Sequence, residues 1–263
     1  MNPSSPILFF DSGVGGLSVL APTRALLANA PIVYAADNAG FPYGKKTDAE
    51  LARRVPELLG RLVERFHPRL AVIACNTAST IALDHARSAL ELPIVGTVPA
   101  IKPAAEVSRT RVIGVLGTEA TVRQPYVDDL ASRFAADCTI VRHGSPQLVE
   151  LAEAKMAGKA IDANEIEAAA KPMFAAPNGE CVDTVVLACT HFPLLKDELQ
   201  SAFPHITYVD GGPGIARRIA YLTRGQPWPT EPIGGLIIYT GLEGNRPPMS
   251  SLTNFGLTEV KTL

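Results

Sequence analysis

The chain has 263 residues, 47% of them hydrophobic, which suffices for one large domain or two smaller ones with packed cores. Its 24 Lys and Arg residues nearly balance 26 Asp and Glu residues, and no basic run interleaved with aromatic residues occurs, so neither nucleic acid nor a membrane is an expected partner. The N-terminal residues have no signal-peptide pattern and no CxxC pair is present, which predicts a cytoplasmic protein with free cysteines.

Short apolar segments alternate with helical patterns along the chain. Strands are predicted at residues 7–11, 32–37, 71–75, 94–98, 112–117, 139–143, 184–189, 206–210 and 236–240. The clearest helix is predicted from about residue 48 to residue 66, where Thr47 and Glu50 have capping-box spacing and Pro56 lies inside the segment. This alternation predicts an α/β fold with largely parallel sheets.

Two cysteines follow apolar runs in similar contexts, AVIACNTAS (71–79) and VVLACTHFP (185–193). Cys75 and Cys189 are therefore expected at the carboxyl ends of two buried strands, just before residues that favour helix N-caps. Ligands of parallel α/β sheets bind at those ends. Two thiols in equivalent places suggest a pair of reactive groups on opposite sides of one substrate.

The two halves of the chain repeat a second pattern, since ILFFDSG (7–13) is similar to VIGVLGT (112–118). We expect two similar α/β domains that face each other with the site in the cleft between them. The first would comprise residues 1–98 plus 208–263 and carry the Asp11 and Cys75 loops. The second would comprise residues 99–207 and carry the Thr118 and Cys189 loops.

A dinucleotide-binding site and a metal site are weaker interpretations of the same loops. Gly13, Gly15 and Gly16, with Asp37 after the next strand, imitate a dinucleotide-binding fingerprint, but Ser18 stands where its final glycine should be. No metal is predicted, because Cys189 and His191 lack further ligands nearby.

Cys138 and Cys181 are expected to be inert packing residues. The histidines expected to have surface or local structural roles are His67, His85, His143 and His205.

Six ordered motifs are similar to those of the glutamate racemases, a family of cofactor-independent amino-acid racemases. They are DSGVGGLSVL (11–20), FPYGKK (41–46), ACNTAS (74–79), GVLGTEATV (114–122), ACTHFPLL (188–195) and VDGG (209–212). The resemblance implies interconversion of L- and D-glutamate, which supplies the D-isomer for peptidoglycan. It also implies two domains related by a pseudo-twofold axis, no cofactor, and a homodimer as one oligomeric option.

The resemblance assigns Cys75 to the D-isomer and Cys189 to the L-isomer. Two thiols suit this chemistry, because a modest pKa shift makes both thiol and thiolate accessible near neutral pH. Asp11 is expected to assist Cys75, and His191 and Glu153 to assist Cys189. Glu150 lies one helical turn from Glu153 and is the alternative acid.

Substrate binding is expected to depend on hydroxyls, amides and helix N-termini, since these loops contain almost no Arg or Lys. The residues expected to bind substrate are Asp11, Ser12, Asn76, Thr77, Thr118, Thr121, Thr190 and His191, to which the resemblance adds Pro42, Tyr43 and Gly44. Two alternatives stay open, a racemase of aspartate or another amino acid on the same scaffold and a non-catalytic two-domain binding protein. Because some family members use an N-terminal extension for activation and only six residues precede the first strand here, activity without an activator is expected.

Overall fold

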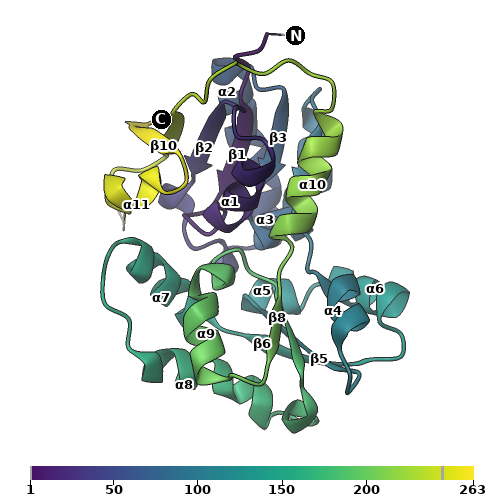
Figure 1. The fold of residues 1–263 in the computed structure, drawn as a ribbon. Coiled ribbons are helices and arrows are strands. Elements are labelled where there is room, and N and C mark those ends of the chain that lie inside the picture. Colours follow the sequence, from purple (N-terminus) through teal and green to yellow (C-terminus); the bar gives the residue numbers. More distant parts are fainter. Residues whose placement is uncertain (1, 244–245) are drawn as a thin grey trace.

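The computed structural model of the chain describes residues 2–243 and 246–263 and contains two parallel sheets, seen in the upper and lower halves of Figure 1. The first sheet has the order β10-β9-β2-β1-β3-β4 and the second the order β6-β5-β7-β8. The first contains β1 (Ile7–Asp11), β2 (Ile32–Ala36), β3 (Leu70–Ile73), β4 (Ile94–Gly96), β9 (Gly235–Tyr239) and β10 (Leu257–Thr262). The second contains β5 (Val112–Gly117), β6 (Thr139–Gly144), β7 (Thr184–Leu187) and β8 (Thr207–Val209).

Helices cover both faces of each sheet, because the central strands are apolar on both sides. In β1, Ile7 and Phe9 pack toward one helix layer, while Leu8 and Phe10 pack toward the other. The first sheet lies between α1 (Leu17–Leu26), α10 (Gly212–Leu222) and α11 (Met249–Thr253) on one face and α2 (Asp48–Phe66) and α3 (Asn76–Ala89) on the other.

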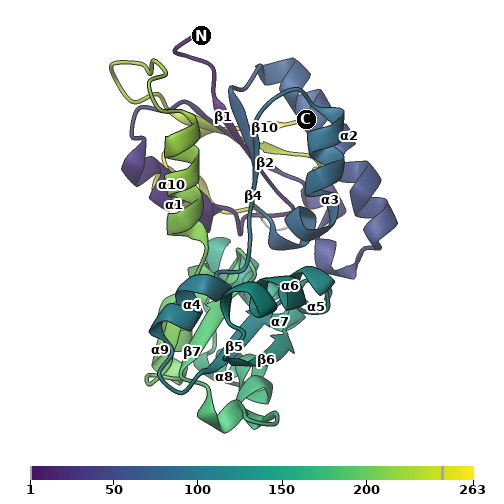
Figure 2. The ribbon, with the colours of Figure 1, turned by 90° about the vertical axis from the view of Figure 1, so that its right-hand side faces the viewer.

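The second sheet is layered in the same way. Its helices are α7 (Pro146–Met156), α8 (Ala163–Ala175) and α9 (Lys196–Ala202) on one face and α4 (Ile101–Val107) and α6 (Pro125–Phe134) on the other. Short elements complete the fold: α5 (Glu119–Val122) and the 3-10 turns η1 (Asn38–Gly40), η2 (Tyr43–Lys45), η3 (Gly179–Cys181) and η4 (Phe192–Leu195). Figure 2 shows the two sheets from the side, with α10 packed beside α1.

The predicted α/β class with parallel sheets is confirmed, and the strand order repeats between the sheets. The order β2-β1-β3-β4 corresponds to β6-β5-β7-β8, with parallel pairing throughout. As expected, the last part of the chain returns to the first sheet, where β9 pairs with β2. The pseudo-twofold axis stays a prediction.

Several predicted strand ends differ from the structure. The strands predicted to reach Cys75 and Cys189 end two residues earlier, at Ile73 and Leu187: Cys75 is the N-cap residue of α3, and Cys189 lies in a bend. The predicted domain boundary between residues 207 and 208 falls inside β8, which pairs with β7 of the second sheet. Strand β10 was missed because it is largely exposed and gives no apolar signal.

Helix α2 has the predicted bounds, and its capping box is formed. Thr47 accepts a hydrogen bond from the Glu50 backbone N–H, and the Glu50 side chain accepts one from the backbone N–H of Thr47. Pro56 lies within the helix without ending it.

We therefore expect Thr47→Ala to lower the free energy of unfolding by about 1 kcal/mol, the usual cost of losing an N-cap. Urea unfolding followed by circular dichroism measures this. Glu64→Ala, an exposed change later in the same helix, should stay within about 0.5 kcal/mol of the wild type. Equal effects of the two substitutions would show that the cap contributes nothing special.

Candidate active site

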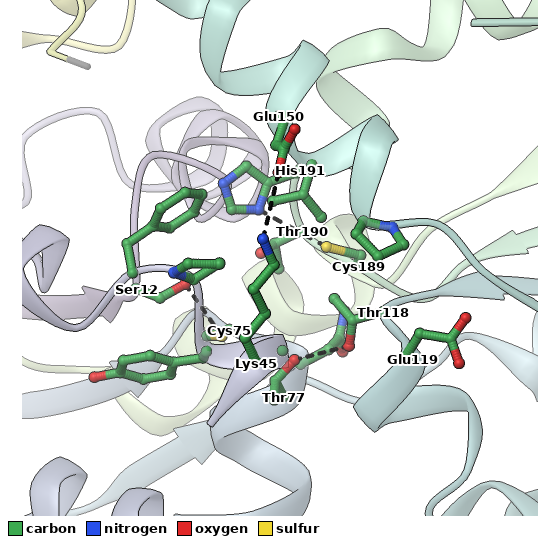
Figure 3. A pocket seen from close by; sticks show the side chains of 17 residues that line it. Ser12, Lys45, Cys75, Thr77, Thr118, Glu119, Glu150, Cys189, Thr190 and His191 are labelled. Atoms are coloured by element: carbon green, nitrogen blue, oxygen red, sulfur yellow. Dashed lines mark hydrogen bonds and ion pairs between the residues drawn. The ribbon is translucent and has the colours of Figure 1, made fainter. Parts of the chain in front are cut away.

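A cavity of about 150 Å³ lies between the two sheets, at the carboxyl ends of their central strands. Cys75 reaches it from the loop after β3 and Cys189 from the loop after β7, so the two thiols enter from opposite sheets (Figure 3). The lining residues are Ser12, Phe41, Pro42, Tyr43, Gly44, Lys45, Cys75, Asn76, Thr77, Thr118, Glu119, Pro146, Val149, Glu150, Cys189, Thr190 and His191.

The first thiol lies at the start of a helix. Cys75 is buried at the N-cap of α3, and its Sγ lies 3.9 Å from the hydroxyl of Ser12. Burial raises the pKa of the Cys75 thiol well above its ordinary value, and the nearby charge of Asp11 adds to this. The backbone N–H of Ala78 opposes the shift without cancelling it. The environment therefore favours the neutral thiol of Cys75.

Asp11 organises the loop that brings Ser12 to this thiol. Its carboxylate is fully buried and accepts hydrogen bonds of 2.8 Å from the backbone N–H groups of Ser12 and Gly16. The Tyr34 hydroxyl donates to the same carboxylate over 3.4 Å. Burial is the main cause that raises the pKa of Asp11. The carboxylate thus lies behind Ser12, and it acts on Cys75 through its charge.

The second thiol belongs to a chain of three side chains. Cys189 Sγ lies 3.8 Å from His191 Nδ1, and His191 Nε2 lies 2.7 Å from Glu153 Oε1. All three residues are buried. Burial lowers the pKa of His191, but its hydrogen bonds to Cys189 and Glu153 outweigh burial and raise the pKa well above the ordinary value. The arrangement favours an imidazolium between a carboxylate and the sulfur.

The loop after β1 packs against these side chains from the other half of the molecule. The backbone N–H of Val14 donates to Glu153 Oε1 over 2.9 Å. A Cβ atom on Gly13 would lie 2.2 Å from Glu153 Oε1, and one on Gly15 would lie 2.4 Å from His191 Nδ1. These two glycines are required by close approach, in addition to any role in the turn.

Hydroxyls and amides supply much of the polar surface of the pocket. Thr77 Oγ1 lies 3.1 Å from Thr118 Oγ1 and 3.3 Å from Thr121 Oγ1, which connects loops of the two halves. Asn76 Oδ1 and Thr190 Oγ1 are buried without a hydrogen-bond partner. Buried polar atoms are rarely left unpaired, so both are suited to bind a polar ligand.

A buried cluster holds the loop at residues 41–46. The Tyr43 hydroxyl donates to Asp37 Oδ2 over 2.5 Å, and Arg54 forms two hydrogen bonds to the same carboxylate. Thr240, after β9, donates to Asp37 Oδ1. Asp37 is fully buried by these partners and is not available to a ribose. This argues against a dinucleotide-binding site.

Glu150 occupies a different place from Glu153. Its carboxylate lies 3.6 Å from Lys45 Nζ, and both side chains are about two-thirds exposed where they line the pocket. Figure 3 draws this ion pair and the Cys189–His191 contact as two separate dashed lines. Glu153, one turn along α7, is the acid that reaches His191.

The structure brings most predicted site residues to the cavity wall. Asp11, Thr121 and Glu153 lie behind the lining, where each contacts another site residue. The predictions omitted Phe41, Lys45, Glu119, Pro146 and Val149 from the lining.

Most of the omitted residues flank predicted ones. Phe41 and Lys45 adjoin Pro42 and Gly44, and Glu119 follows Thr118, so the quoted motifs contained a signal for them. Val149 had none.

Ranges 2–243 and 246–263 contain no group of three or more His, Cys, Asp or Glu residues arranged to hold a metal ion. Within the same ranges, no helix is both long and apolar enough to cross a membrane.

Comparison with known proteins identifies relatives along the whole chain. The family model described as Asp/Glu/Hydantoin racemase matches residues 18–219. A glutamate racemase from Sphingopyxis alaskensis is 62% identical, with 99% of this chain and 98% of the relative covered.

Solved structures agree with the sequence relatives. Escherichia coli glutamate racemase, in complex with L-glutamate and the activator UDP-MurNAc-Ala, is 38% identical with a TM-score of 0.88 over 98% of each chain. Thermus thermophilus glutamate racemase in complex with β-chloro-D-alanine is 28% identical with a TM-score of 0.76, over 100% of this chain and 97% of that one. The chain therefore belongs to the Asp/Glu/hydantoin racemase family and, within it, to the glutamate racemases.

Proposed function

We propose that this chain interconverts L- and D-glutamate with Cys75 and Cys189 as the acid–base pair and without a cofactor. The observation that carries the proposal is the entry of two buried thiols into one pocket from opposite sheets. Racemisation removes the Cα proton from one face and returns a proton to the other. It therefore needs a base and an acid on opposite sides of the substrate.

The electrostatic surroundings of the two thiols differ. In the L-to-D direction, the Cys189 thiolate takes the Cα proton and Cys75 donates its thiol proton to the opposite face of the carbanion. Cys189 is then a thiol and Cys75 a thiolate, and the reverse reaction restores the starting state. The raised pKa of Cys75 favours the thiol form, while the His191 imidazolium is placed to stabilise the Cys189 thiolate.

The carbanion needs stabilisation by fixed dipoles. The first-turn N–H groups of α3 have no acceptor within the helix, and Asn76 and Thr77 of that turn line the pocket. Together with Thr118, they provide donors for the substrate carboxylates and for charge that develops on the α-carboxylate. The remaining predicted contacts, from Ser12, Pro42, Tyr43, Gly44, Thr190 and His191, complete the proposed binding site.

The buried acids Asp11 and Glu153 position the two thiols. Asp11 fixes the loop from which Ser12 touches Cys75, and Glu153 holds His191 against Cys189. The contact of Glu153 with His191 favours it over Glu150 as the assisting acid.

Other parts of the proposal rest on the family. A D-glutamate supply for peptidoglycan, a cytoplasmic location, the division into two domains and a homodimer are implied by it. Activity without an activator stays a prediction, which assays with and without UDP-MurNAc-Ala test. Aspartate racemisation and simple ligand binding are the alternatives, and a chiral assay separates them.

Our first functional prediction concerns isotope uptake. L-Glutamate incubated in deuterated water, with chelator and without pyridoxal phosphate, should yield D-glutamate with deuterium at Cα, while the unreacted L-isomer stays protiated early on. Two opposed thiols predict this because the proton that leaves and the one that arrives are different. Mass spectra of the separated isomers at low conversion give the answer. Protium retained in the early product would indicate a single base.

Substitution separates the catalytic thiols from the other two. Cys75→Ala and Cys189→Ala should each reduce kcat by about 10²- to 10⁴-fold, since each removes the acid–base group on one face. Cys138→Ala and Cys181→Ala, at less buried positions, should keep most of the activity and serve as controls. Substantial turnover by either variant of the first pair would remove that thiol from the mechanism.

The two glutamates of α7 provide a matched test of the histidine. Glu153→Gln should lower the pKa of His191, because it removes the carboxylate charge that favours the imidazolium. Glu150→Gln should leave this pKa nearly unchanged, since Glu150 pairs with Lys45. Titration of the His191 imidazole by NMR compares the two, and equal shifts would contradict the assignment of Glu153.

A further inference from the structure

Ser18 connects the first half of the molecule to the turn that carries Cys189. This residue lies in the first turn of α1, and its hydroxyl donates a 2.8 Å hydrogen bond to the backbone oxygen of Thr190. Thr190 stands between Cys189 and His191 in the sequence. The contact therefore joins a helix of the first sheet to the segment between two site residues of the second.

The Thr190 carbonyl oxygen accepts its hydrogen bond from outside the turn, whereas its two neighbours are bonded within the turn. The Cys189 backbone oxygen accepts from Phe192 N–H over 3.0 Å, and the His191 oxygen accepts from Leu194 N–H over 3.1 Å. The oxygen of Thr190, between them, is the one bound by Ser18. Each of three consecutive carbonyls thus has a donor, and only the middle one depends on the other half of the molecule.

The Ser18–Thr190 hydrogen bond supports the turn that holds Cys189 against His191, and this contact is sensitive to small movements. The separation of 3.8 Å between Cys189 Sγ and His191 Nδ1 is long for a hydrogen bond, even one to sulfur. Gly15, three residues before Ser18, already packs closely against the imidazole ring. A rotation of the turn would therefore change the distance between the thiol and the imidazole.

We propose that Ser18 is a positioning residue for Cys189, holding the 189–191 turn so that the thiol stays in contact with His191. The inference rests on the proposed racemisation and adds a residue that touches neither the substrate nor a reacting atom. It assigns a role to the residue that breaks the dinucleotide fingerprint.

Four variants test the role of the Ser18 hydroxyl. Ser18→Ala removes it, and Ser18→Thr retains it. Ser18→Val matches Thr in shape without the hydroxyl. Ser88→Ala is the remote control, because the Ser88 hydroxyl also donates to a backbone oxygen, that of Asp84, on the exposed side of α3.

We expect Ser18→Ala and Ser18→Val to lower kcat/KM roughly fivefold, the effect of losing one hydrogen bond. Ser18→Thr should retain most of the activity, and Ser88→Ala should match the wild type. Circular dichroism and thermal unfolding verify that each variant is folded. If Ser18→Ala does not fold, the comparison of Thr with Val decides the matter.

Primary kinetic isotope effects identify which of the two thiols Ser18 positions. The two glutamate isomers have equal free energies, so kcat/KM must fall equally in both directions. The primary effect with L-[2-²H]glutamate should rise in Ser18→Ala, because proton abstraction by Cys189 becomes more rate-limiting, while the effect with D-[2-²H]glutamate should not rise.

Each remaining outcome overturns one statement. Failure of the wild type to racemise glutamate would overturn the proposed function itself. Wild-type racemisation with unchanged rates and isotope effects in Ser18→Ala would overturn only the role of Ser18. Equal rises with both isomers, or equal losses in the Thr and Val variants, would indicate a general structural effect and also overturn it.

Discussion

One carboxylate oxygen joins the two halves of the site. Glu153 Oε1 accepts from the Val14 backbone N–H of the first half and from the His191 imidazole of the second. This arrangement requires the loop after β1 to approach Glu153 and His191 without side chains, which explains Gly13 and Gly15. Because the same loop also presents Asp11 and Ser12 to Cys75, the surroundings of both thiols depend on its position.

The two thiols are equivalent in topology but not in electrostatics. Cys75 lies at the start of α3 beside a buried carboxylate, which together with burial favours its neutral form. Cys189 lies beside a histidine whose pKa is raised through its own hydrogen bonds. A two-base reaction needs one thiol and one thiolate at the start of each direction. The environment of Cys75 favours its thiol form, which is the form that the proposed L-to-D direction requires at this position.

Sequence reasoning could predict those parts of the structure that depend on local pattern. Continuous apolar runs marked the buried central strands, and Thr47 with Glu50 marked the start of α2. The ends of β3 and β7 were predicted too late, because an apolar alanine before each cysteine continues the apolar pattern although the paired strands end at Ile73 and Leu187. Exposed β10 had no such pattern.

Tertiary contacts were harder to predict. The sequence analysis expected Glu153 and kept Glu150 as the alternative, but only the orientation of α7 shows which carboxylate meets His191. The link from Ser18 to Thr190 spans two separate motifs, and no local pattern indicates it. The site residues were predictable to the extent that strand ends converge, whereas their mutual contacts depend on how the two sheets face each other.

The scarcity of basic side chains in the pocket has a mechanistic consequence. Among the described lining residues, Lys45 and His191 are the basic ones, and Lys45 is exposed and paired with Glu150. A fixed cation would bind the α-carboxylate strongly before the reaction begins, and such ground-state binding does not raise kcat. Hydroxyls and helix N–H groups are weaker partners for the ground state, and they can strengthen as negative charge develops in the transition state. A pocket built from Thr77, Thr118 and the start of α3 therefore suits a reaction whose main barrier is the formation of a carbanion next to an existing carboxylate.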